Sequence, residues 1–154
     1  MATESSSCHS KPKQKKGNNM SEILKLTIPG SPEYIRIAKM AVAQAASTEG
    51  LDVEKTEDLQ VAVGEACRLI SCHGYAAWSD TYNVIFQVED EKIIVVVNDE
   101  TGNHSLAKNG FHQCVDCPNE GDIGIKLIEC TMDEVEITRA EKGCRSIKLV
   151  KNLK

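Results

Sequence analysis

An unbroken apolar run at Ile93–Val97 is the strongest constraint on how this chain folds. A short apolar run bounded by polar residues is typical of a strand in the middle of a sheet. Residues 81–88 form a second strand-like segment, and the tight acidic turn Glu89-Asp90-Glu91 joins the two. The sequence therefore predicts a β-hairpin that includes the central strand of a sheet.

Two amphipathic helices are predicted before this hairpin. Ser31 and Pro32 indicate a helix start, because a serine side chain can cap the first turn and proline fits the first helical position. Gly50 is a plausible end for this helix. A second helix is predicted at about residues 53–73, and its apolar residues recur at helical spacing. This buried stripe consists of Leu59, Ala62, Val63, Ala66 and Ile70.

The remaining segments complete an α+β pattern. Residues 22–29 read as a first strand, and a third helix is expected at about 123–132. Residues 135–140 and 144–150 form a closing hairpin, while 99–121 is a long polar stretch of the kind that is usually functional. The order β-α-α-β-β-loop-α-β-β predicts a two-layer α+β sandwich with helices on one face of a mixed sheet.

Charge divides the chain into a basic tail and an acidic body. Residues 1–19 contain four lysines and one glutamate, a net charge of +3, so residues 20–154 carry −8 of the total of −5. We expect the tail to be disordered and residues 20–154 to form one domain. The tail could also contact an acidic partner or a membrane surface. An acidic body excludes binding to duplex DNA through the domain.

The sequence also favours a reducing, water-filled compartment. No apolar run approaches the roughly 18–20 residues that span a bilayer, and the N-terminus lacks an apolar leader segment. The seven cysteines are an odd number and do not suggest a secreted disulfide framework. Aromatic residues, at 4%, are too few for stacking on single-stranded nucleic acid. We expect a cytoplasmic protein without a membrane span or a direct nucleic-acid partner.

Several motifs resemble one family in the right order. They are DLQVAVGEACRLISCHGY at residues 58–75, MDEV at 132–135, the closing Gly143 with IKLVK at 147–151, and the first helix with PEY at 32–34 and Arg36. Over about residues 20–152 the chain resembles bacterial anti-sigma factors with serine kinase activity, of the anti-sigma-B and anti-sigma-F type. These proteins share the ATPase fold of histidine kinases, Hsp90 and MutL.

The resemblance implies a partner-switching mechanism. Such proteins hold a sigma factor away from RNA polymerase and release it when a STAS-type antagonist competes. They use ATP and Mg²⁺ to phosphorylate a serine of the antagonist, which then no longer binds. The resemblance also implies a homodimer formed through the sheet side, and places Arg36 where the sigma factor and the antagonist make contact.

The resemblance assigns roles to residues on the second helix and after the central strand. Glu65 takes the position of the general base. Leu69 stands where the family has an asparagine that ligates magnesium, and leucine has no oxygen to offer a hard cation. Asp99 takes the position of the aspartate that accepts a hydrogen bond from adenine. The family follows it with D-x-G-x-G, but here Gly102 is the only glycine and is out of step.

The second glycine-rich motif is also altered. Gly124 is retained and is expected to open the third helix, where free N–H groups can bind phosphate. Asp122 would place a negative charge there, or act as the helix cap. Changes in the metal ligand, the adenine loop and the phosphate-binding motif together predict weak or absent ATP hydrolysis. We expect a degenerate kinase fold that still binds its protein partners, a sigma factor and a STAS-type antagonist. An active serine kinase with an unusual metal arrangement is the first alternative.

A cysteine and histidine cluster in the polar stretch gives the second alternative. His104, His112, Cys114 and Cys117 have the spacing H-x7-H-x-C-x2-C. Two thiolates and two imidazoles can bind zinc, and a C-x-x-C pair can form a redox-switched dithiol. The chain could then be a metal or redox sensor, or these could be ordinary loop thiols. The helical cysteines, Cys67, Cys72 and Cys130, are expected to fill the core.

Overall fold

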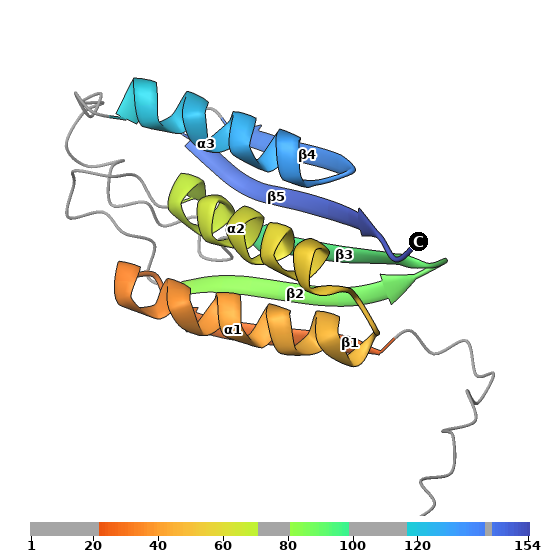
Figure 1. Ribbon diagram of the computed structural model, residues 1–154. Helices are drawn as coiled ribbons and strands as arrows, with labels where there is room; N and C mark the ends of the chain where they lie inside the picture. Colours follow the sequence, from red (N-terminus) through yellow and green to blue (C-terminus); the bar gives the residue numbers. More distant parts are fainter. Residues whose placement is uncertain (1–21, 71–80, 99–116, 141–142) are drawn as a thin grey trace, which may run out of the picture.

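The computed structural model describes residues 22–70, 81–98, 117–140 and 143–154. Three helices and five strands follow the expected order (Figure 1). Only the third helix differs clearly in extent, because it begins six residues before the expected start at 123. The elements are β1 (Ile23–Pro29), α1 (Pro32–Thr48), α2 (Val53–Ile70), β2 (Thr81–Glu89), β3 (Lys92–Asn98), α3 (Cys117–Thr131), β4 (Glu134–Ala140) and β5 (Gly143–Asn152).

The five strands form one sheet in the order β1-β2-β3-β5-β4. The α+β sandwich is confirmed, but the expected mixed sheet is wrong, since every strand pairing in the described residues is antiparallel. Two helices separate β1 from β2, and the chain changes direction at each connection. With three changes of direction, β2 runs opposite to β1, and the two strands pair antiparallel. A single helix separates β3 from β4, which favours parallel strands, but β5 lies between them and pairs with both. The predicted central strand, β3, is indeed in the middle of the sheet.

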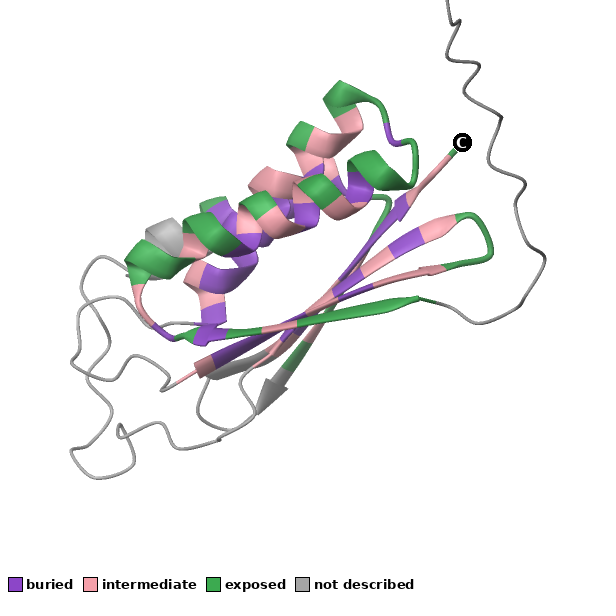
Figure 2. Ribbon diagram, turned by 90° about the horizontal axis from the view of Figure 1, so that it is seen from below, coloured by how far each residue is buried: buried purple, intermediate pink, exposed green. Residues whose placement is uncertain are grey.

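The helices cover one face of the sheet, and α2 lies between α1 and α3 (Figure 1). Figure 2 shows the buried residues concentrated where the helices meet the strands. Alternation along the strands directs every second side chain toward the helices. Fully buried members of this core include Leu59, Val63 and Ala66 of the predicted α2 stripe, together with Tyr82, Val95, Val97, Ile128, Ile147 and Leu149.

A proline marks the start of α1, and an aspartate side chain caps the start of α2. Ser31 is the residue before α1, but its side chain makes no capping hydrogen bond; Pro32 at the first helical position has no N–H to satisfy. Asp52, which the sequence reading did not single out, caps α2, because its Oδ1 accepts a hydrogen bond of 2.8 Å from the backbone N–H of Lys55. Gly50 follows α1 with a φ of +83°, as expected for a residue just beyond a helix end.

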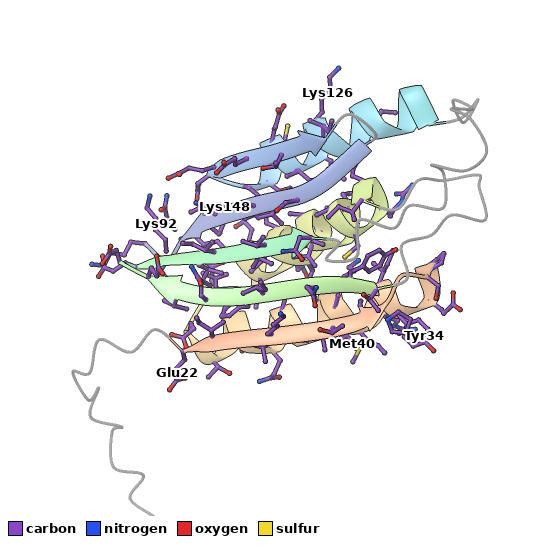
Figure 3. The ribbon with its side chains drawn as sticks, turned by 180° about the vertical axis from the view of Figure 1, so that it is seen from behind. Glu22, Tyr34, Met40, Lys92, Lys126 and Lys148 are labelled. Atoms are coloured by element: carbon purple, nitrogen blue, oxygen red, sulfur yellow. The ribbon has the colours of Figure 1, made fainter. Side chains whose placement is uncertain are left out.

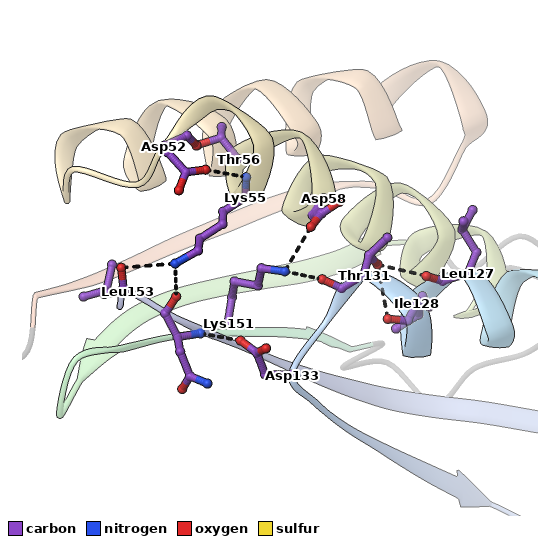
Figure 4. Close-up of polar contacts among 11 residues, drawn as sticks. Asp52, Lys55, Thr56, Asp58, Leu127, Ile128, Thr131, Asp133, Lys151 and Leu153 are labelled. Atoms are coloured by element: carbon purple, nitrogen blue, oxygen red, sulfur yellow. Dashed lines mark hydrogen bonds and ion pairs between the residues drawn. The ribbon is translucent and has the colours of Figure 1, made fainter.

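A polar cluster joins α2, α3 and β5 at the edge of the core (Figure 4). The Nζ of Lys151 lies 3.0 Å from Oδ2 of Asp58 and donates to the carbonyl oxygen of Thr131 at 2.5 Å. Lys151 is only 9% exposed, and it stands on the strand face that the helices cover. Asp133 adds a hydrogen bond of 2.7 Å from the backbone N–H of Asn152 to its Oδ2. The buried ammonium therefore ties the last residue of α3 to both neighbouring elements.

Among the described residues, no helix is long and apolar enough to cross a membrane. The expected basic tail, residues 1–19, lies outside the described residues.

Candidate functional site

The candidate site is built on α2, which contacts both other helices and the sheet. Its buried stripe faces the core, while Glu65, Arg68 and Leu69 lie along its half-buried sides. Oε1 of Glu65 accepts a hydrogen bond of 2.9 Å from Nη1 of Arg68, one turn further along the helix. The Glu65 side chain is 19% exposed and that of Arg68 is 42% exposed. The candidate general base is therefore engaged by a cation on its own helix.

Gly124 of α3 faces the same carboxylate. A Cβ atom at this position would lie 3.1 Å from Oε2 of Glu65 and 3.6 Å from Cδ2 of Leu69. The missing side chain lets α3 approach α2 so closely that both side chains pack against its backbone. Gly124 is buried, and Leu69 packs against the hydrophobic core. These three residues form a direct contact between α2 and α3.

The placement of Gly124 corrects one expectation. We expected Gly124 to open the third helix, but α3 begins at Cys117, so Gly124 and Asp122 lie within the helix. Gly124 therefore does not present free N–H groups of a first helical turn to a phosphate, because its backbone lies inside the helical hydrogen-bonding pattern. Its role in the structure is that of a close contact with α2.

The other predicted site residues lie at or beyond the limits of the described chain. β3 ends at Asn98, directly before Asp99. Asp99 and Gly102 lie outside the described residues, as do His104, His112 and Cys114. Cys117, the last member of the predicted cluster, is the first residue of α3. Within the described ranges, no group of three or more histidine, cysteine or acidic side chains is placed to hold a metal ion.

An open groove between α1 and α2 brings Arg36 together with residues that the sequence reading missed. Arg36 is exposed on α1. Arg68 lines the groove from α2 and also donates to Glu65, so it contacts both the groove and the candidate general base. The spacing of three residues between Glu65 and Arg68 could have indicated their pairing from sequence. The residues lining this α1–α2 groove are Pro32, Ile35, Arg36, Lys39, Met40, Gln60 and Arg68.

The two described helical cysteines differ in environment. Cys67 is fully buried on α2, as expected for a core residue, and burial raises the pKa of its thiol from 9.0 to about 12. Cys130 is exposed on α3, so the expectation that it fills the core is wrong; it lies two residues from the buried Ile128, on the opposite side of the helix. Cys72 lies outside the described residues.

We predict that iodoacetamide at neutral pH modifies Cys130 rapidly and leaves Cys67 unmodified until the protein unfolds. Thiolate is the reactive form, and burial disfavours it at Cys67. Mass spectrometry of the digested protein measures both sites in one sample. Equal rates of modification at the two cysteines in folded protein would contradict the burial of Cys67.

The raised pKa of Cys67 makes the free energy of unfolding depend on pH. Because the folded pKa of Cys67 is raised, its contribution to stability is complete below pH 9, where the thiol is protonated in both states. It is lost as the pH rises from 9 toward 12, since only the unfolded state releases the proton, with a slope of up to about 1.4 kcal/mol per pH unit. Urea unfolding across this range should show a shallower decline for Cys67→Ala than for wild type. Parallel declines would contradict the prediction.

Comparison with known proteins places the chain in a family. The family profile described as histidine kinase-like ATPase domain matches residues 28–151. The serine-protein kinase RsbW of Bacillus licheniformis is 30% identical over 125 residues, which are 75% of this chain and 78% of that protein. The RsbW of Staphylococcus epidermidis is 28% identical over 143 residues, 86% of this chain and 88% of its own.

Solved structures show the same fold. The RsbU and RsbW domains of a Mycobacterium tuberculosis protein match with a TM-score of 0.63 at 19% identity, over 86% of this chain and 32% of that one. A protein in the SiaB–SiaC complex of Pseudomonas aeruginosa matches with a TM-score of 0.56 at 14% identity, over 82% of this chain and 88% of that one. The chain belongs to the histidine kinase-like ATPase domain family and, within it, to the RsbW-like serine-protein kinases.

Proposed function

We propose that this chain is an anti-sigma factor-like, partner-switching regulator of transcription whose nucleotide site is degenerate. In this proposal it binds a sigma factor and a STAS-type antagonist, and it transfers phosphate weakly or not at all. The observation that carries the proposal is the contact of Leu69 and Glu65 with Gly124 between α2 and α3. The family resemblance assigns the metal ligand of an active member to the position of Leu69, which lies in this contact.

The donor set around Leu69 does not fit magnesium. Magnesium takes oxygen ligands in near-ideal octahedral geometry, and an isobutyl side chain supplies none. The Leu69 side chain packs against the core and lies 3.6 Å from where a Gly124 Cβ would be. A metal ion at this position would have to displace an apolar contact and gain no ligand from it. We therefore assign no catalytic step to a metal here.

The surroundings of Glu65 support the same proposal. A general base must be free to accept a proton from the substrate hydroxyl. One oxygen of Glu65 already accepts from Arg68 at 2.9 Å, and the other faces the backbone of α3 at Gly124. The described geometry therefore favours a structural carboxylate.

Three partner and location assignments belong to the proposal. Arg36, exposed on α1, is proposed to contact the sigma factor and the antagonist through acidic groups. A homodimer is proposed through the sheet face opposite the helices, where Ile85, Ile94 and Val96 are only partly buried. A cytoplasmic location follows from such partners. Asp99, Gly102 and the cluster of His104, His112, Cys114 and Cys117 keep their predicted roles as hypotheses.

The substitution Leu69→Asn tests the degenerate site directly. The amide oxygen restores a ligand for magnesium, so we expect affinity for a fluorescent ATP analogue to rise about tenfold in Mg²⁺, with no gain in EDTA. Leu69→Ala is the control, since it removes the same apolar contact without adding an oxygen. If wild type already binds the analogue as tightly as Leu69→Asn, with the same dependence on Mg²⁺, the proposal fails and the active-kinase alternative stands.

A further inference from the structure

The α1–α2 groove differs in charge from the domain around it. Its lining contains Arg36, Lys39 and Arg68, and no acidic residue is among the described residues that line it. Residues 20–154 nevertheless carry a net charge of −8. Arg68 is paired with Glu65, but Arg36 and Lys39 still give this groove an excess of positive charge within an acidic domain. Regions of opposite sign steer and select partners of complementary charge.

Apolar groups accompany the cations. Pro32, Ile35 and Met40 line the same groove, and the Met40 side chain is 62% exposed. Figure 3 shows Met40 and Tyr34 along α1, and Tyr34 is 37% exposed. Exposed methionine is common where a protein surface adapts to a partner. The groove thus offers charge recognition together with apolar contact.

We propose that the α1–α2 groove binds an acidic segment of a partner protein that also carries an apolar side chain for Met40. The inference rests on the proposed partner-switching function and extends it from the single residue Arg36 to a defined surface. The chain's own tail is a poor occupant, because residues 1–19 carry a net charge of +3. A second copy of this domain is also a poor occupant, because a symmetric contact would bring the two cationic grooves against each other.

Packing against α2 holds the stem of Lys39 in place. A Cβ atom at Gly64 would lie 3.1 Å from Cδ of Lys39, so the aliphatic part of Lys39 lies against the α2 backbone. Nε2 of Gln60 donates to the carbonyl oxygen of Lys39 at 3.5 Å, which links α2 to α1 beside the groove. Because the Lys39 stem is packed, less side-chain entropy is lost when its ammonium binds a carboxylate.

Arg68 connects this groove to Glu65. Arg68 is one of the residues that line the groove, and its Nη1 donates a hydrogen bond of 2.9 Å to Oε1 of Glu65. A partner carboxylate in the groove therefore competes with Glu65 for the same donors. Docking of an acidic segment would loosen the ion pair between Glu65 and Arg68 on α2, so the partner surface and the candidate nucleotide site share one residue.

The test uses a short helical peptide, acetylated and amidated, with glutamates along one face and leucines along the adjoining face. Heteronuclear NMR titration of the full chain should shift the amide signals of α1 and α2 around the groove and the side-chain Nε–H signal of Arg68. The affinity should fall with added salt. A peptide with lysines in place of the glutamates, and one with serines in place of the leucines, should both bind more weakly.

Matched variants locate the site. Arg36→Glu and Lys39→Glu should each weaken peptide binding about tenfold, while Lys126→Glu, the same charge change on exposed α3, should not. Glu65→Gln removes the negative charge that competes with a partner carboxylate for Arg68, so it should tighten binding about twofold to threefold, whereas Glu57→Gln, at an exposed position on α2, should not.

Three results would overturn the inference: peptide signals that map away from the groove, unchanged affinity in Arg36→Glu and Lys39→Glu, or a wild-type homodimer that dissociates in Arg36→Glu. The last result would assign the groove to a second copy. A negative peptide result would not affect the proposed degenerate nucleotide site, because the ATP-binding measurements do not involve the peptide. Tight binding of Mg-ATP would instead refute the degenerate site and leave the groove result standing.

Discussion

Replacing Lys151 by methionine is expected to lower the free energy of unfolding by about 2–3 kcal/mol. The ammonium of Lys151 is almost fully buried and contacts Asp58 at 3.0 Å and the Thr131 carbonyl at 2.5 Å (Figure 4). Methionine fills much of the volume but leaves both acceptors without this donor. Because the Asp58 side chain is 35% exposed, water recovers part of the loss, and the value lies below that of a fully buried pair. Urea unfolding with a fixed m-value measures the change.

Lys148→Met is the matched control for this prediction. Lys148 is on the same strand but on the opposite face of the sheet, its side chain is 45% exposed, and its ion pair with Glu136 is 4.0 Å long. Figure 3 shows it on the side away from the helices. We expect a change below about 0.5 kcal/mol. Equal losses in the two variants would show that Lys151 does not tie α3 to α2 and β5.

Substituting Gly124 by leucine is expected to destabilise the domain by about 2 kcal/mol. The new side chain would start 3.1 Å from Oε2 of Glu65 and 3.6 Å from Leu69, so α3 would have to move away from α2. Overpacking of this kind costs about 1–3 kcal/mol, and the better helix propensity of leucine offsets less than 1 kcal/mol. Thermal or urea unfolding of the variant gives the net value.

Gly124→Ala separates packing from helix propensity. A single methyl group gains nearly the same propensity and requires Glu65 to move only by a few tenths of an ångström, so we expect a change within about 1 kcal/mol of zero. If leucine and alanine at this position both stabilise the protein, α3 does not contact α2 through Gly124, and the account of this interface is wrong.

The element order was predictable because the signals for it are local. The helical stripe of α2 and the apolar run of β3 depend on spacing within a few turns or residues, and the structure confirms both. Strand order is a different kind of property. The closing hairpin can pair with β3 through either of its strands, and only the whole-chain arrangement places β5 beside β3 and makes the sheet antiparallel.

The site was predictable only in part. Glu65 and Leu69 stand on a long helix with clear periodicity, so their proximity on one side of α2 follows from sequence. Gly124 was expected to open a helix because glycine commonly marks an end, yet here it allows two helices to approach, and that use leaves no local signal. Arg36, Lys39 and Arg68 line one groove only because α1 packs against α2. That packing cannot be predicted from the sequence of either helix alone.

The proposed degenerate site requires that Glu65 and Leu69 pack against Gly124 in place of bound magnesium and triphosphate. Isothermal titration of the full chain with Mg-ATP, followed by a phosphate-transfer assay on a STAS-domain protein, tests it most directly. We expect no measurable heat, or binding weaker than about millimolar, and no transfer. Micromolar affinity for Mg-ATP together with phosphorylation of a serine on the STAS protein would contradict the account.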